Sequence, residues 1–173
     1  YMPPSEGTAK VAGFDVFDNS LEMRRHVGYM PENVPLYRDM TVRGQLDFVA
    51  RMHNVENRRE RIMHVLERVG MTDRARSLIR NLSKGMRQRV GLAQAIVHDP
   101  EVLILDEPTI GLDPHQVQDF RALIRELGET RTVMLSTHIL SEAEQICDRI
   151  IILDRGQIVA EDTPDQLRDR LHQ

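Results

Sequence analysis

The chain has 173 residues, of which 40% are hydrophobic and 29% are charged, and its formal net charge is −4. That balance is typical of one globular domain with a packed core. The negative charge, the few aromatic residues and the lack of Trp argue against a nucleic-acid partner, which needs basic patches and stacking side chains. No apolar run reaches the roughly 18 residues that a membrane-spanning helix needs.

The first eighty residues change from strand patterns to helix patterns. Thr8–Val16 and His26–Pro31 predict strands, because each short segment is bounded by turn residues or stopped by proline. From Thr41 to about Arg80, apolar side chains recur at intervals of three and four residues, which predicts two or three helices. We expect no strand within this helical stretch.

The rest of the chain alternates between helix and strand patterns, which predicts an α/β domain with a parallel sheet and a helical insertion. The strand at Val102–Leu105 is continuously apolar, so we expect it to be buried on both faces. Helix caps are predicted at Asp113, at Ser141 with Glu144, and at Thr163. The other predicted elements are a helix at Ser83–His98 and strands at Thr132–Thr137, Arg149–Leu153 and Gln157–Glu161.

Polar side chains follow two strands of this predicted sheet. Asp106 and Glu107 come directly after the first strand, and His138 follows the next. Ligands of open α/β sheets bind beyond the carboxyl ends of the strands. There Asp106 can reach Mg²⁺ through water, Glu107 can act as a general base on water, and His138 can hydrogen-bond a terminal phosphate. Each residue alone is typical of an ordinary turn or a structural histidine, but their coincidence favours a phosphate-handling site.

The segment LSKGMRQR opens the helix that precedes Val102–Leu105. Ser83 and the backbone amides near Gly85 lie at the N-terminus of this helix, where the helix dipole favours an anion. An ordinary N-cap serine explains the same pattern. The basic residues that follow it are equally typical of a solvated helix face.

A phosphate-binding loop of the form G-x-x-x-x-G-K-[ST], the Walker A motif, is absent from the sequence. In such a loop the backbone amides cradle the phosphates and the lysine neutralises their charge. Gly7 with Gly13, and Gly85 with Gly91, have the wrong spacing, and no Lys-Ser or Lys-Thr pair follows them.

In their order along the chain, these segments resemble the motifs of the ATP-binding cassette (ABC) ATPases. LSKGMRQR resembles the signature motif, VLILDE the Walker B strand and GLDP the D-loop, and His138 lies where the family has its switch histidine. VGYMPEN occupies the position of the Q-loop. The resemblance covers nearly the whole chain and is strongest toward ATPase subunits of bacterial exporters of the gliding-motility and multidrug-efflux types.

The resemblance implies a P-loop NTPase fold, with a RecA-like parallel-sheet core and an inserted helical subdomain. The helical signature subdomain would span about residues 41–97, and the α/β core would comprise residues 1–40 and 98–173. In the family the Walker A loop precedes the segment that resembles Thr8–Val16. The resemblance therefore implies an N-terminally truncated domain whose Walker A loop lies upstream of Tyr1, and a chain that is inactive alone.

The resemblance also implies roles at the domain's own nucleotide, which would be ATP with Mg²⁺. Glu107 would be the catalytic base, and His138 would contact the γ-phosphate. Asp106 would approach Mg²⁺ through water. Glu32, in the Q-loop segment, would approach both the nucleotide and Mg²⁺. It replaces the glutamine that the family has there, so its charge changes the site.

Four further residues would contact ATP bound to a second ABC ATPase domain, because domains of this family pair head to tail. They are Ser83, Lys84 and Gly85 of the signature segment and Asp113 of the D-loop segment. Lys84 and Met86 stand where the family has Gly and Gln, whereas Ser83 and Gly85 match it.

The resemblance finally implies an ATP-hydrolysing subunit of an export transporter. Its partners would be a second copy of the domain in a homodimer, and a transmembrane permease subunit bound in a groove beside the helical subdomain and the Q-loop. Nucleic acid is not an expected partner. The protein would be cytoplasmic and peripheral on the cytoplasmic face of the cell membrane. Two alternatives stay open: an ABC-type ATPase acting on nucleic acid or ribosomes, and a non-catalytic ABC-like interaction module.

Overall fold

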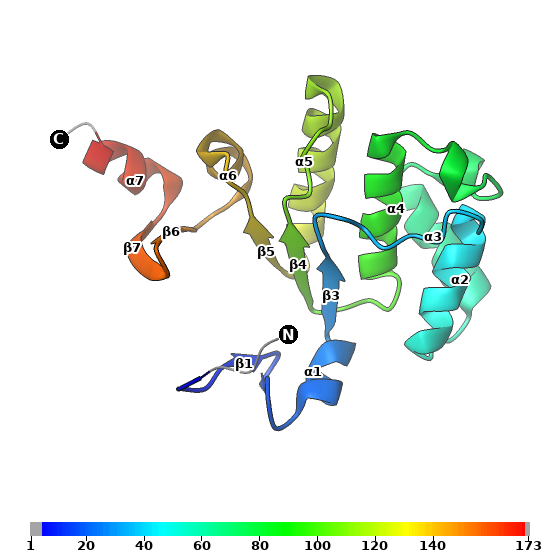
Figure 1. Cartoon of the computed structure of the whole chain (residues 1–173), viewed down its shortest axis with the longest axis horizontal. Helices are drawn as coiled ribbons and strands as arrows, with labels where there is room; N and C mark the ends of the chain where they lie inside the picture. Colours follow the sequence, from blue (N-terminus) through cyan, green and yellow to red (C-terminus); the bar gives the residue numbers. More distant parts are fainter. Residues whose placement is uncertain (1–4, 172–173) are drawn as a thin grey trace.

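A three-stranded parallel sheet lies at the centre of the molecule (Figure 1). The computed structural model describes residues 5–171. The strands follow the order β3-β4-β5, and both neighbouring pairs are parallel. The predicted α/β class with a parallel sheet is therefore confirmed. The strands of this sheet are β3 (Val27–Met30), β4 (Val102–Asp106) and β5 (Thr132–Ser136).

The helices lie around this sheet in separate groups. Figure 1 shows α2, α3 and α4 together at one side of the sheet, and α7 with a hairpin at the other side. Within residues 5–171, no helix is long and apolar enough to cross a membrane. The helices are α1 (Ser20–Arg25), α2 (Val42–Met52), α3 (Arg58–Arg68), α4 (Lys84–Ile96), α5 (Pro114–Gly128), α6 (Leu140–Ile146) and α7 (Pro164–Leu171), with 3-10 turns at Thr72–Arg74 and Ile79–Asn81.

Two of these helices begin at side chains that the sequence identifies as caps. Ser83 Oγ accepts a hydrogen bond from the Met86 backbone N–H at 3.2 Å, at the start of α4. Asp113 Oδ1 accepts one from the Gln116 N–H at 3.0 Å, at the start of α5, where Pro114 is the first helical residue. Both bonds satisfy amides that have no partner within the helix. The predicted starts of α4 and α5 are confirmed.

The two faces of the sheet differ in burial. On one face Leu103 and Leu105 of β4 are fully buried in the main hydrophobic core, to which α4 and α5 contribute. On the other face Tyr29, Ile104 and Met134 stand in register across the three strands. Tyr29 is 44% exposed and Met134 is 60% exposed. The expectation that the apolar β4 segment is buried on both faces is therefore wrong.

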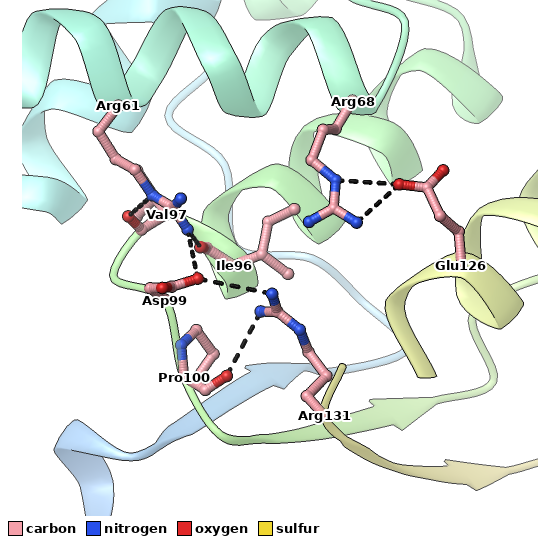
Figure 2. Close-up of polar contacts among 8 residues, drawn as sticks. All are labelled: Arg61, Arg68, Ile96, Val97, Asp99, Pro100, Glu126 and Arg131. Carbon is pink, nitrogen blue, oxygen red and sulfur yellow. Dashed lines mark hydrogen bonds and ion pairs between the residues drawn. The ribbon is translucent and has the colours of Figure 1, made fainter. Parts of the chain in front are cut away.

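An arginine of α3 fixes the end of α4 (Figure 2). Arg61 donates hydrogen bonds to the backbone oxygens of Ile96 at 2.8 Å and Val97 at 2.9 Å. It also pairs with Asp99 Oδ1 at 2.9 Å, and Arg131, at the entry to β5, approaches the same oxygen at 3.5 Å. Backbone oxygens at a helix C-terminus lack partners within the helix. Arg61 therefore supplies those partners while joining α3 to the turn that leads into β4.

A second arginine of α3 joins the helical group to α5. Arg68 Nε and Nη2 both donate to Glu126 Oε1, at 3.1 Å and 2.7 Å (Figure 2). Arg61 and Arg68 lie seven residues apart, two turns along one side of α3. Helix α3 is therefore held to the core at two separate points.

The C-terminal part forms a smaller unit. Strands β6 (Ile150–Asp154) and β7 (Gln157–Asp162) pair antiparallel, with Gly156 in the turn between them at φ +80°. The two predicted strands are therefore confirmed. Ala143, Ile150 and Leu167 form a separate small core there.

The predicted capping box of Ser141 and Glu144 is wrong. Helix α6 begins at Leu140, so Ser141 lies inside its first turn, and Ile139 occupies the cap position without a side-chain hydrogen bond. Thr137 Oγ1 instead accepts from the Ile139 N–H at 3.1 Å.

The predicted strand at Thr8–Val16 is a hairpin instead. It contains β1 (Lys10–Val11) and β2 (Phe14–Asp15), which pair antiparallel. Ala12 and Gly13 form the turn, both with positive φ, at +50° and +81°. Two successive residues of this kind match the twist of a tight hairpin.

Candidate active site

The carboxyl ends of β4 and β5 bring three of the predicted site residues together. Asp106 and Ser136 are register partners at the ends of these strands, and Ser136 Oγ donates to Asp106 Oδ1 at 2.5 Å. The backbone N–H of Glu107 donates to the backbone carbonyl oxygen of Ser136 at 3.1 Å. His138 lies two residues after Ser136 in the chain. Neighbouring parallel strands thus place two carboxylates and an imidazole at one edge of the sheet.

Glu107 and His138 contact each other directly. The backbone N–H of His138 donates to Glu107 Oε1 at 2.9 Å, and the ring Nδ1–H donates to the same oxygen at 2.8 Å. The Glu107 side chain is 19% exposed and that of His138 is 66% exposed. This hydrogen bond raises the pKa of His138, and the negative charges of Glu107, Glu142 and Glu32 act in the same direction. The carboxylate is thus held in a fixed place and favours a protonated imidazole.

The backbone of Glu107 has an unusual conformation. Its φ is +45°, in the left-handed region that side chains other than glycine rarely adopt. Such a conformation costs on the order of 1–3 kcal/mol and persists only where the surroundings hold it. Here the bonds to Ser136 and His138 do so.

The N-termini of α4 and α5 lie against each other. Lys84 is exposed and its side chain extends over Gly111, where an added Cβ would lie 2.1 Å from Lys84 Nζ. Gly85 is buried, and a Cβ there would lie 2.6 Å from Gln116 Oε1. Ser83 is exposed beside them. The signature segment and the D-loop segment are therefore neighbours within one chain.

Glu32 and Asp106 supply oxygen atoms near the same edge of the sheet. Glu32 is exposed, two residues beyond β3, and its charge contributes to the raised pKa of His138. Within residues 5–171, no three His, Cys, Asp or Glu side chains are grouped as a metal site. Mg²⁺ commonly binds through one or two carboxylates, with water and substrate phosphates completing its shell. The hard oxygen donors of Asp106 and Glu32 fit that mode.

Three polar residues that the sequence reasoning missed join the site. Ser136 is bonded to Asp106, and its place at the end of the neighbouring strand is a signal that could have found it. Thr109 and Glu142 are both 5% exposed and form a hydrogen bond at 2.5 Å. That contact joins a loop to a helix 33 residues later, and no sequence pattern indicates it.

The family model for ABC transporters matches residues 1–110 of the chain. The chain belongs to the ABC transporter family. A solved ATP-binding subunit of an ABC transporter superposes on 99% of this chain and 72% of its own, with a TM-score of 0.85 and 30% sequence identity. That likeness confirms the predicted P-loop NTPase type of sheet core.

Similar proteins of this family occur in several bacteria. The uncharacterized ABC transporter ATP-binding protein YdbJ of Bacillus subtilis is 43% identical over 92% of this chain and 52% of its own length. The bacitracin transport ATP-binding protein BcrA of Bacillus licheniformis is 38% identical over 98% of this chain and 56% of its own. The daunorubicin resistance ATP-binding protein DrrA3 of Streptomyces coeruleorubidus is 38% identical over 96% of this chain and 54% of its own length. The chain spans about half the length of these relatives.

Proposed function

We propose that this chain is part of the ATP-hydrolysing subunit of an ABC exporter. The observation that carries the proposal is the cluster of Asp106, Glu107 and His138 at the carboxyl ends of β4 and β5. Relatives named for bacitracin transport and daunorubicin resistance support the exporter type. The class of exported compound stays open.

In this proposal each residue at the sheet edge has one task. Glu107 accepts a proton from the water that attacks the γ-phosphate, and its contact with His138 fixes the direction of the carboxylate. Protonated His138 donates to the γ-phosphate or the attacking water, a role that its raised pKa favours. Mg²⁺, when bound, neutralises charge on the terminal phosphates. Asp106 and Glu32 would hold it, Asp106 being oriented by Ser136.

The signature segment acts on a second nucleotide in this proposal. Ser83, Lys84, Gly85 and Asp113 would face ATP held by a second copy of the domain, with the amides at the start of α4 directed at its phosphates. The helical signature subdomain, about residues 41–97, would bind a transmembrane permease subunit beside the Q-loop. The core would comprise residues 1–40 and 98–173, and the dimer would work at the cytoplasmic face of the membrane.

The proposed hydrolysis needs a phosphate-binding loop. No Walker A motif occurs in them, and the relatives are about twice as long. We therefore propose that an adjoining segment supplies the loop and its lysine, which hold the β- and γ-phosphates. The 173 residues alone would bind ATP weakly and hydrolyse none.

The test uses the complete ATPase domain with MgATP. Glu107→Gln keeps the shape of the side chain and removes the base, so phosphate release should fall by roughly 10²–10⁴-fold while ATP affinity is retained. Glu129→Gln, an exposed residue after α5, is the matched control and should hydrolyse ATP at the parent rate. Parent-like turnover by Glu107→Gln would refute the assignment of the base.

A further inference from the structure

Glu142 is a buried carboxylate to which the proposed mechanism gives no role. It lies in the first turn of α6 and is 5% exposed. Thr109 Oγ1 donates to its Oε2 at 2.5 Å, and Arg121 Nη2 of α5 pairs with its Oε1 at 3.2 Å. A buried charge is tolerated only when such partners compensate for lost water. Both oxygens of Glu142 are therefore committed to residues of two other elements.

Arg121 of α5 contacts a second residue of α6 besides Glu142. The Arg121 Nη1 donates to Gln145 Oε1 at 2.6 Å, one turn beyond Glu142 in α6. Arg121 is 19% exposed in its side chain. The guanidinium of Arg121 thus joins α5 to α6. Glu142 also accepts the hydrogen bond from Thr109, so it connects the loop after β4 to the same two helices.

The two chain segments that carry Glu107 and His138 are joined twice. The exposed contact is Glu107 with His138, and the buried contact is Thr109 with Glu142. Thr109 lies two residues after Glu107, and Glu142 lies four residues after His138. Because Glu107 has a strained backbone, its position depends on what fixes the residues next to it. Thr109 is the buried anchor of that loop.

We propose that Glu142 is a positioning residue that holds Thr109, and through it the loop after β4, so that Glu107 and His138 stay in contact. The inference deepens the proposed function and rests on it for its catalytic meaning. Errors of about 1 Å in such a constellation cost about 10²-fold in rate. A single buried hydrogen bond two residues from the base is well placed to prevent them.

The first test measures the contact itself and needs no hydrolysis. The pKa of His138 is raised chiefly by its hydrogen bond with Glu107, and Glu142 and Glu32 contribute by charge. Thr109→Val leaves all three carboxylates in place, with Glu142 still paired with Arg121, so a lower pKa of His138, measured by NMR titration of the ring, reports mainly the lost positioning. Thr109→Ser keeps the hydroxyl and should keep the raised pKa. An unchanged pKa in Thr109→Val would overturn the inference.

The second test measures catalysis in the complete ATPase domain. Thr109→Val and Glu142→Gln should lower kcat by about 10- to 100-fold with little change in KM for MgATP. Thr109→Ser should restore most of kcat. Glu144→Gln, the same change two residues along α6 at a side chain paired with Arg168, is the control and should act like the parent. A kcat equal to that of the parent in both Thr109→Val and Glu142→Gln contradicts the inference.

The two tests separate this inference from the proposed function. If the parent domain hydrolyses no ATP, the proposed function fails, while the titration of His138 in Thr109→Val still decides whether Thr109 positions Glu107. Thermal unfolding of each variant identifies those that lose the fold. In that case the comparison uses Thr109→Ser, which keeps the hydroxyl, and Glu142→Asp, which keeps the charge. A His138 pKa that stays raised in Thr109→Ser and falls in Glu142→Asp supports the inference.

Discussion

Two donors of His138, its backbone N–H and its ring Nδ1–H, converge on a single oxygen of Glu107. Within residues 5–171 no hydrogen bond is found to the other oxygen, Glu107 Oε2. A carboxylate held on one side and available on the other is suited to orient water, because its direction is set before the water arrives. The two hydrogen bonds from His138 also help to hold Glu107 in its strained backbone conformation.

The signature serine should act on the nucleotide of a second copy. In the complete domain, Ser83→Arg should abolish hydrolysis and leave ATP binding by the monomer nearly intact, because the positive side chain occupies the space for the partner's γ-phosphate. Mixing it with a Walker A lysine variant should restore part of the activity through one intact composite site. Loss of ATP binding in the Ser83→Arg monomer would show instead that the serine acts within its own chain.

The stability of the fold should fall in mild acid because of His98. Burial, together with the charge of the stacked His53 ring, lowers the pKa of His98 to about 4. The unfolded chain titrates near 6.5, so the folded state binds fewer protons between these values. The free energy of unfolding should therefore be highest above about pH 6.5 and drop by roughly 3 kcal/mol as the pH falls to 4.

Urea unfolding at a series of pH values checks this effect. His98→Gln should flatten the dependence between pH 6.5 and 4. His64→Gln, at an exposed position of α3, should leave it unchanged. An equally steep dependence in His98→Gln would mean that another group causes the acid sensitivity.

Gly28 should not tolerate a side chain. A Cβ at Gly28 would lie 2.1 Å from the backbone oxygen of Ala95 and 2.6 Å from Leu103 Cδ2. A helix backbone cannot withdraw from β3 without unpacking, so Gly28→Ala should cost more than about 3 kcal/mol. Gly128→Ala, where the nearest atom is 3.9 Å away, is the control and should be neutral or slightly stabilising. Equal stability of the two variants would contradict the packing of α4 on β3.

The planar fork of Arg61 should matter more than its charge. Arg61→Lys keeps the charge but cannot donate to Ile96, Val97 and Asp99 together, so we expect a loss of about 1–3 kcal/mol in urea unfolding. Arg59→Lys, at an exposed position of the same helix, should change stability little. A fully stable Arg61→Lys would show that the bonds at the end of α4 are dispensable.

Local signals predicted the elements well, and parallel strand ends predicted the gathering of the site. The caps at Ser83 and Asp113 depend on residues three apart, so the sequence displays them directly. The hairpin turn was missed because Ala12 adopts a positive φ that its residue type disfavours. The bond between Thr109 and Glu142 was missed because it forms only when α6 packs on the loop. The catalytic and nucleotide-binding roles stay predictions.

Helix α4 connects the signature segment to the turn before β4. Its 13 residues make a rod of about 20 Å, with the signature segment at one end and the bonds of Arg61 at the other. Because the rod is about 20 Å long, a tilt of about 5° at the Arg61 end would move the opposite end by nearly 2 Å. That displacement exceeds the tolerance of a hydrogen bond to a phosphate. Because α4 is one continuous helix, we expect a change at the turn before β4 to move Ser83 at its other end.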